Sequence, residues 1–250
     1  MQELIQNIVH WLHGMGIHPN ADTAAAVGHA VGQAGATVGD AVAPVVAKMD
    51  MPSLMALAAA LGWASGLRLY AVVFITGLAG LAGWVALPEG LQVLQHPALL
   101  VASGFMLFVE FFADKIPGLD SVWDLLHTVI RIPAGAALAA GVFGADGTTM
   151  AAVAALLGGT LAATSQAAKT TARAAINTSP EPFSNVSASL FEDGLVMGAL
   201  WLAMTSPLVF AGVLFVTVLA MWAMTWVLFK FLRAVLRRIS SFVSGSERAT

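Results

Sequence analysis

Nine charged side chains lie inside or at the ends of apolar runs of the sequence, where they could bind an ion or a charged solute. They are Arg68, Glu110, Asp114, Lys115, Arg131, Lys169, Arg173, Glu192 and Asp193. Ionisable groups at such places are costly in a membrane and often mark ion or substrate paths. The carboxylates would accept protons or hard cations such as Mg²⁺, Ca²⁺ or Mn²⁺, although the sequence does not identify a metal. The basic groups would hold an anionic group.

Two pairs among these residues have helical spacing. Glu110 and Asp114 are four residues apart, as are Lys169 and Arg173, so each pair shares one face of a helix. Glu110 stands among phenylalanines, where an acidic side chain should face the interior of a bundle and have a partner. All nine residues arrive at one level of the predicted bundle. We interpret them as a polar site; the alternative is a set of structural ion pairs that fix helix packing.

The segment between Lys115 and Arg131 is amphipathic and carries Asp120, Asp124 and His127. Asp120 is well placed as the N-cap of a new helix. We expect Asp120, Asp124 and His127 to lie on the solvated side of a surface helix. Lys115 and Arg131 would anchor that helix by extending their charged ends to water.

The composition is that of a membrane protein. Of the 250 residues, 58% are hydrophobic and 10% are charged, against about 25% charged in soluble domains. The net charge of −3 and the lack of a nucleic-acid motif argue against a nucleic-acid partner. There is no cysteine, and no nucleophile, zinc or phosphate-loop motif is present, so we expect neither an enzyme nor a cofactor.

Six apolar segments approach the roughly 20 residues that cross a bilayer. They are residues 69–87, 97–113, 132–144, 148–168, 187–205 and 207–229, of which the third is short. If both termini are cytoplasmic, every one of the 11 Lys and Arg residues falls on the inner side. Basic residues concentrate in cytoplasmic loops, which favours this topology.

The remaining sequence divides the chain into three parts. Residues 1–52 form an amphipathic and low-complexity region, 53–232 a transmembrane domain and 233–250 a basic cytoplasmic tail. Residues 54–65 are apolar but short, and we interpret them as an interfacial or re-entrant helix that breaks at Gly66. The predicted fold is therefore an all-α, polytopic membrane bundle. It has about six transmembrane helices, a broken or re-entrant segment and an N-terminal amphipathic helix.

Four blocks of sequence carry a family resemblance: GWASGLRLYAVVF, LPEGLQVLQHP, VEFFADKIPGLDSVWDLLHTVIRIPAGA, and INTSPEPFSN followed by LFEDGLV. They resemble a bacterial multi-pass membrane family known as domain of unknown function 4126. The resemblance covers about residues 57–207. It implies a bacterial cytoplasmic (inner) membrane location but no established activity, so the site residues rest on physical reasoning.

Our first hypothesis is a small transporter or channel whose charged cluster faces the cytoplasm and binds an ion or a small charged solute. An alternative is a translocase of a phosphate-bearing lipid, which would require the basic residues to converge on a cleft open to lipid. A non-catalytic membrane scaffold and a membrane-embedded enzyme are further alternatives. The expected partners are the lipid bilayer and the solute, and the many small residues leave a homo-oligomer open.

Overall fold

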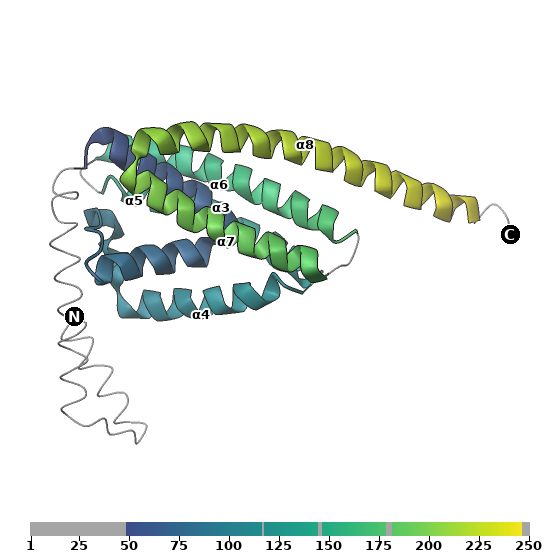
Figure 1. Ribbon diagram of the computed structural model, residues 1–250, viewed down its shortest axis with the longest axis horizontal. Helices are drawn as coiled ribbons and strands as arrows, with labels where there is room; N and C mark the ends of the chain where they lie inside the picture. The colour runs from purple at the N-terminus through teal and green to yellow at the C-terminus, as the bar shows by residue number, and fades with distance from the viewer. Residues whose placement is uncertain (1–48, 117, 145–146, 179–181, 247–250) are drawn as a thin grey trace, which may run out of the picture.

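A computed structural model describes residues 49–116, 118–144, 147–178 and 182–246, and these residues form a bundle of long helices (Figure 1). The elements are α3 (Met51–Leu81), the 3₁₀ helix η1 (Glu89–Gln95), α4 (Pro97–Ala113), α5 (Leu119–Gly141), α6 (Thr148–Ile176), α7 (Pro182–Thr205) and α8 (Pro207–Ser246). The predicted all-α class is confirmed. The predicted N-terminal amphipathic helix lies outside the described residues.

Four of the described helices are long and apolar enough to cross a membrane: α3, α6, α7 and α8. A fifth span results if η1 and α4, which meet at an angle of 69°, cross together. The third predicted segment, 132–144, begins in the second half of α5 and ends just beyond it, and the first half of α5 carries charged residues. The chain is thus a multi-span membrane protein, and its described residues contain four or five candidate spans, against the six that the sequence predicts.

Helix α3 has a break at Arg68, whose φ of −146° and ψ of 73° are not helical. The limb before the break runs parallel to α6, since Gly62 faces Gly158 and Gly66 faces Ala162. Helix α6 is antiparallel to α5, since Gly158 faces Ala139 and Gly135 faces Ala162. The first limb of α3 is therefore antiparallel to α5.

The limb after Arg68 runs the other way. Tyr70 contacts His127 early in α5, whereas Gly90, beyond the end of this limb, contacts Gly141 at the end of α5. The chain thus enters the bundle, turns at Arg68 and returns, as the re-entrant interpretation predicts. Helix α3 is therefore a candidate span by length and composition, but it does not form one straight helix across the membrane. The break lies at Arg68 and not at the predicted Gly66.

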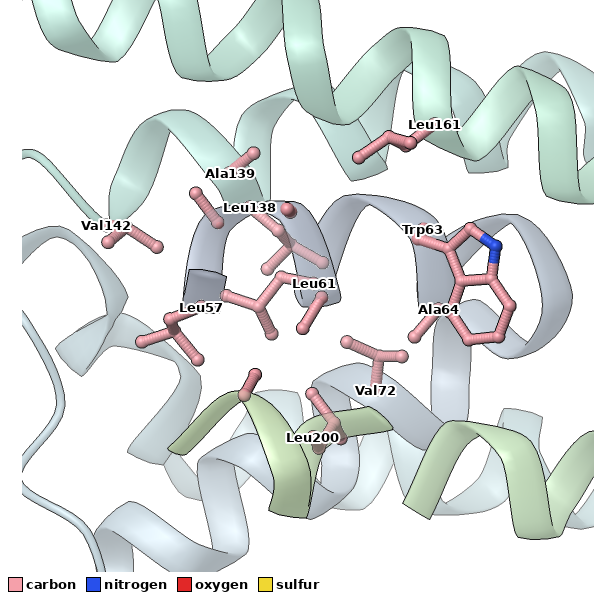
Figure 2. Packing of buried hydrophobic residues seen from close by; sticks show 14 of the residues in the cluster. Leu57, Leu61, Trp63, Ala64, Val72, Leu138, Ala139, Val142, Leu161 and Leu200 are labelled. Carbon is pink, nitrogen blue, oxygen red and sulfur yellow. The ribbon is translucent and has the colours of Figure 1, made fainter. Parts of the chain in front are cut away.

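The first limb of α3 is the centre of the hydrophobic core and not an interfacial helix. Figure 2 shows Leu57, Leu61 and Ala64 of this limb surrounded by Leu138 and Ala139 of α5, Leu161 of α6 and Leu200 of α7. Glycines allow the closest approach. A Cβ on Gly62 would lie 2.4 Å from the Cα of Gly158, and a Cβ on Gly66 would lie 2.2 Å from a carbonyl oxygen of α6. Small residues of this kind let membrane helices pack backbone to backbone.

Helix α5 buries its polar face and exposes its apolar face, the reverse of an amphipathic helix in a soluble protein. Asp124 and Arg131 are fully buried, whereas Leu125 and Val129 on the opposite face are 67% and 77% exposed. The predicted surface helix with solvated Asp120, Asp124 and His127 is therefore wrong, since these three residues are also buried. A helix whose apolar face points outward fits a lipid environment, where polar groups are satisfied inside the protein.

Helix α8 starts at the same end of the bundle as α3, because Pro52 and Pro207 line one groove. Its 40 residues are about 60 Å long, twice the roughly 30 Å hydrocarbon core, and it extends beyond the other helices (Figure 1). The start of α3 and the end of α8 consequently lie at opposite ends. A cytoplasmic location of both termini depends on residues 1–48, outside the described part, and stays a prediction.

Candidate functional site

Nine charged side chains from five helices form one ion-pair network inside the bundle. Its members are Arg68 of α3, Glu110 and Asp114 at the end of α4, Asp124 and Arg131 of α5, Lys169 and Arg173 of α6, and Glu192 and Asp193 of α7. Seven of the nine side chains are fully buried. Glu192 is 11% exposed and Asp193 is 33% exposed.

Asp114 is the centre of one half of the network. Arg68 Nη1 lies 3.0 Å and Lys169 Nζ 3.1 Å from its Oδ2 atom, and Arg173 Nη2 lies 3.9 Å away. Asp114 is the C-cap residue of α4, so its carboxylate lies where the helix ends and can contact all three basic groups. Arg68 reaches it from the turn of α3. Three helices thus meet at one carboxylate.

Helix α7 supplies the second set of acceptors. Arg173 makes a two-pronged contact with Glu192, with Nε at 3.3 Å and Nη2 at 3.1 Å from the two carboxylate oxygens. Such forks are strong and geometrically specific. Arg68 Nε lies 3.0 Å from Asp193 Oδ1, and its Nη2 donates a 2.6 Å hydrogen bond to Ser189 Oγ.

Arg131 organises the other half of the network. It pairs with Glu110, lies 2.8 Å from Asp124 Oδ1 and donates a 2.8 Å hydrogen bond to Gln166 Oε1. Lys169 joins the two halves, because its Nζ lies 3.2 Å from Asp124 Oδ1 as well as close to Asp114. The pairing is therefore continuous from α3 to α7.

Lys169 also satisfies the backbone at the break in α3. Its Nζ donates a 3.0 Å hydrogen bond to the carbonyl of Leu67, next to the non-helical Arg68. A buried carbonyl without a partner is unfavourable, so this contact stabilises the turn. The turn of the re-entrant hairpin and the charged network consequently depend on each other.

Replacing Lys169 with methionine should therefore cost about 3 to 5 kcal/mol of stability, because it leaves carboxylates in the interior without a shared base. Thermal unfolding in detergent would measure this loss. Lys115→Met is the matched control, since Lys115 is only partly buried and lies outside the network. Equal unfolding temperatures for both variants would contradict the bridging role.

A set of hydrogen bonds next to the network joins the start of α5 to the end of α6 and the start of α7. Asp120 Oδ1 accepts hydrogen bonds from the amide of Gly118 at 2.9 Å and from Asn177 Nδ2 at 2.8 Å. Asn185 Nδ2 donates to Asn177 Oδ1 at 2.9 Å, and its carbonyl accepts from Arg173. Asp120 lies in the first turn of α5; the N-cap is Gly118, with a φ of 86° that favours glycine.

Eight of the nine predicted residues belong to the network, and Lys115 does not. Its Nζ donates to the Phe111 carbonyl and lies 2.9 Å from the centroid of the Phe111 ring. The sequence-based reasoning missed Asp124 as a network member. Its spacing of seven residues from Arg131, two helical turns, is a signal that would have placed both on one face.

The network has more acids than bases. Its five carboxylates face four basic side chains, so it carries one negative charge when every group is ionised. Within the described residues, three of its buried carboxylate oxygens have no hydrogen-bond partner: Glu110 Oε2, Asp114 Oδ1 and Asp124 Oδ2. No group of three or more His, Asp or Glu side chains in the described part of the chain is arranged to hold a metal ion.

A family model described as "Domain of unknown function (DUF4126)" matches residues 55–228. The match includes every member of the network and about the first half of α8, which the sequence resemblance left out. No curated protein and no solved structure matches the chain.

Proposed function

The chain belongs to the DUF4126 family, whose description names no activity, and we propose that it is a small membrane transporter with the ion-pair network as its ion site. In this proposal the network binds and releases a proton, and the proton drives the movement of a small charged solute. The observation that carries the proposal is the excess of one carboxylate over the bases in a buried network that links five helices.

A proton is the ion that this arrangement suits best. An uncompensated negative charge is unfavourable in a low-dielectric interior, and protonation of one carboxyl group removes it. Each carboxylate of the network contacts at least one base, so a proton that binds to an acid releases a basic group to another partner. Re-pairing of this kind would couple the proton to a change in helix contacts.

Helix packing alone is a weaker explanation of so many charges. One charge at the centre of a span costs about 2.5 to 3.5 kcal/mol on insertion scales. Buried ion pairs repay that cost only with good geometry, and well-packed hydrophobic residues often do as well or better. Stability alone would therefore be served by an apolar core, which favours an additional role for the charges.

The exposure of the α7 carboxylates suggests a route for the proton. Asp193 is the most exposed member of the network, Glu192 is slightly exposed and the remaining members are buried. Protonation of Asp193 would weaken its contact with Arg68, which would then pair more strongly with Asp114. Because Arg68 is the turn of α3, this change would act on the tip of the re-entrant hairpin.

We place this site towards the cytoplasmic side of a bacterial inner membrane. The basis is the charge distribution: the basic residues of the network and Lys230 and Arg233 of α8 lie away from the end where α3 and α8 begin. Basic residues favour the cytoplasmic side. Lipid translocation is less well supported, because Arg68, Arg131, Lys169 and Arg173 are buried in ion pairs instead of opening on a lipid-facing cleft.

The test is ion flux into proteoliposomes, followed with a pH-sensitive dye and a panel of monovalent and divalent cations. The comparison is between the wild type, Glu110→Gln and Glu192→Gln, with the exposed Glu89→Gln as control. We expect flux in the wild type and the control, and a loss of about tenfold or more in the two network variants. An absence of flux with every ion, together with network variants that are merely less stable, would support a scaffold instead.

A further inference from the structure

A groove on the outside of the bundle leads to the most exposed member of the network. It lies between the second limb of α3, α4 and α7 and has a volume of about 430 Å³. Its walls include Ile75, Leu107, Phe108, Phe111 and Met197, and Asp193 is its charged residue among those described. Phe108 and Met197 are 62% and 54% exposed, so the groove faces the lipid.

Asp193 is unusually placed for a lipid-facing carboxylate. Its ion pair with Arg68 approaches from the protein interior, yet a third of the side chain remains exposed towards the groove. A carboxylate beside hydrocarbon is unfavourable unless a cation pairs with it. The groove therefore offers an anionic contact to a cation that arrives from the membrane side.

Lys115 provides the opposite charge at the same aromatic wall. Its Nζ lies 2.9 Å from the centroid of the Phe111 ring, and Phe111 lines the groove. Asp193 lines the same groove as this ring. A ligand in the groove would thus meet the Asp193 carboxylate on the groove wall, the Lys115 ammonium beside the Phe111 ring, and apolar walls along the rest.

We propose that this groove binds a zwitterionic aminophospholipid. One acyl chain fills the apolar groove, the headgroup ammonium pairs with Asp193, and the phosphate pairs with Lys115. An anionic phospholipid without an amine offers Asp193 no second cation besides Arg68, and a lipophilic amine without a phosphate offers Lys115 no anion. The ligand is distinct from the transported solute, so this inference goes beyond the proposed function.

The test measures lipid binding to the delipidated, detergent-purified protein by native mass spectrometry. The probes are phosphatidylethanolamine, phosphatidylglycerol with the same acyl chains, and a long-chain alkylamine. We expect phosphatidylethanolamine to bind about tenfold more tightly than either of the others, as one additional charge-assisted contact would give. Equal binding of the three probes would overturn the proposal.

Variants separate the headgroup contacts from the acyl-chain groove. Asp193→Asn should abolish the preference over phosphatidylglycerol, and Lys115→Gln should abolish the preference over the alkylamine. Met197→Trp fills the groove while keeping both charges, and should weaken binding of every probe. Glu89→Gln, an exposed carboxylate of η1, is the control and should behave as the wild type.

An unchanged lipid preference in Asp193→Asn would also overturn the proposal, provided that the variant unfolds at the wild-type temperature. If Asp193→Asn does not fold, Met197→Trp with wild-type binding is sufficient to reject it. These measurements use no ion gradient. They can fail while the proteoliposomes show ion flux, so their failure is distinguishable from a failure of the transporter proposal.

Discussion

Replacement of Arg131 with methionine is expected to lower the free energy of unfolding by about 3 to 5 kcal/mol, among the largest effects of any single change in this protein. Arg131 is fully buried and pairs with both Glu110 and Asp124, which are fully buried as well. The variant leaves two carboxylates without this base in the interior. Unfolding in detergent, followed by circular dichroism, measures the loss, and Arg233→Met on the exposed part of α8 is the control.

A charge-neutralised variant tests the cause. Arg131→Met combined with Glu110→Gln and Asp124→Asn removes the unpaired charges together with the base. We expect it to recover most of the lost stability, because neutral amides tolerate burial far better than ionised carboxylates. If Arg131→Met alone is as stable as the wild type, the network does not hold α4 and α5 together in the way described.

The second large effect is expected at the contact between α3 and α6. Gly62→Val should prevent the native packing of α3 against α6, because the Cβ of the new side chain would lie 2.4 Å from the Cα of Gly158. The neighbour is backbone and cannot turn aside as a side chain can. Overpacking costs about 1 to 3 kcal/mol where side chains can adjust, so a loss of about 3 kcal/mol or more is expected here.

Gly198→Val is the matched control for this prediction. Gly198 lies in α7, and a Cβ there would have no atom within 4 Å. The yield of folded protein on gel filtration and the unfolding temperature are the readouts. Similar values for the valine variants of Gly62 and Gly198 would show that α3 and α6 are not packed backbone to backbone.

The sequence predicted the network well because the chemistry of its residues conflicts with their surroundings. Glu110 lies among phenylalanines and Glu192 lies inside an apolar run, so each needed an internal partner. The helix bounds of α4 agree with the predicted segment because Pro97 starts it and the break before Gly118 follows it. Local signals of this kind do not depend on the rest of the fold.

Asp124 was missed because amphipathicity was interpreted as it would be in water. An amphipathic helix in a soluble protein buries its apolar face, whereas α5 buries Asp124 and exposes Leu125. The sequence pattern is the same in both cases, and only the surroundings of the helix decide which face is buried. The start of the predicted segment 132–144 was misplaced as well, since Pro133 lies within α5, which begins at Leu119.

The position of the break in α3 depended on a tertiary contact. Gly66 has the usual residue type for a break, but it remains helical and its missing side chain makes room for α6. The break occurs at Arg68, where Lys169 bonds to the neighbouring carbonyl and carboxylates receive the guanidinium group. These partners come from helices about 50 to 120 residues away in the sequence, so no local pattern identifies them.

Infrared spectroscopy of the carboxyl groups tests most directly whether the network holds a proton that it can release. Because the network has five acids and four bases, we expect an infrared band of a protonated, buried carboxylic acid. This band should disappear as the pH is raised. Glu110→Gln balances the charges and should remove this band, whereas Glu89→Gln should keep it. A wild-type spectrum without such a band at any pH at which the protein is folded would contradict the account.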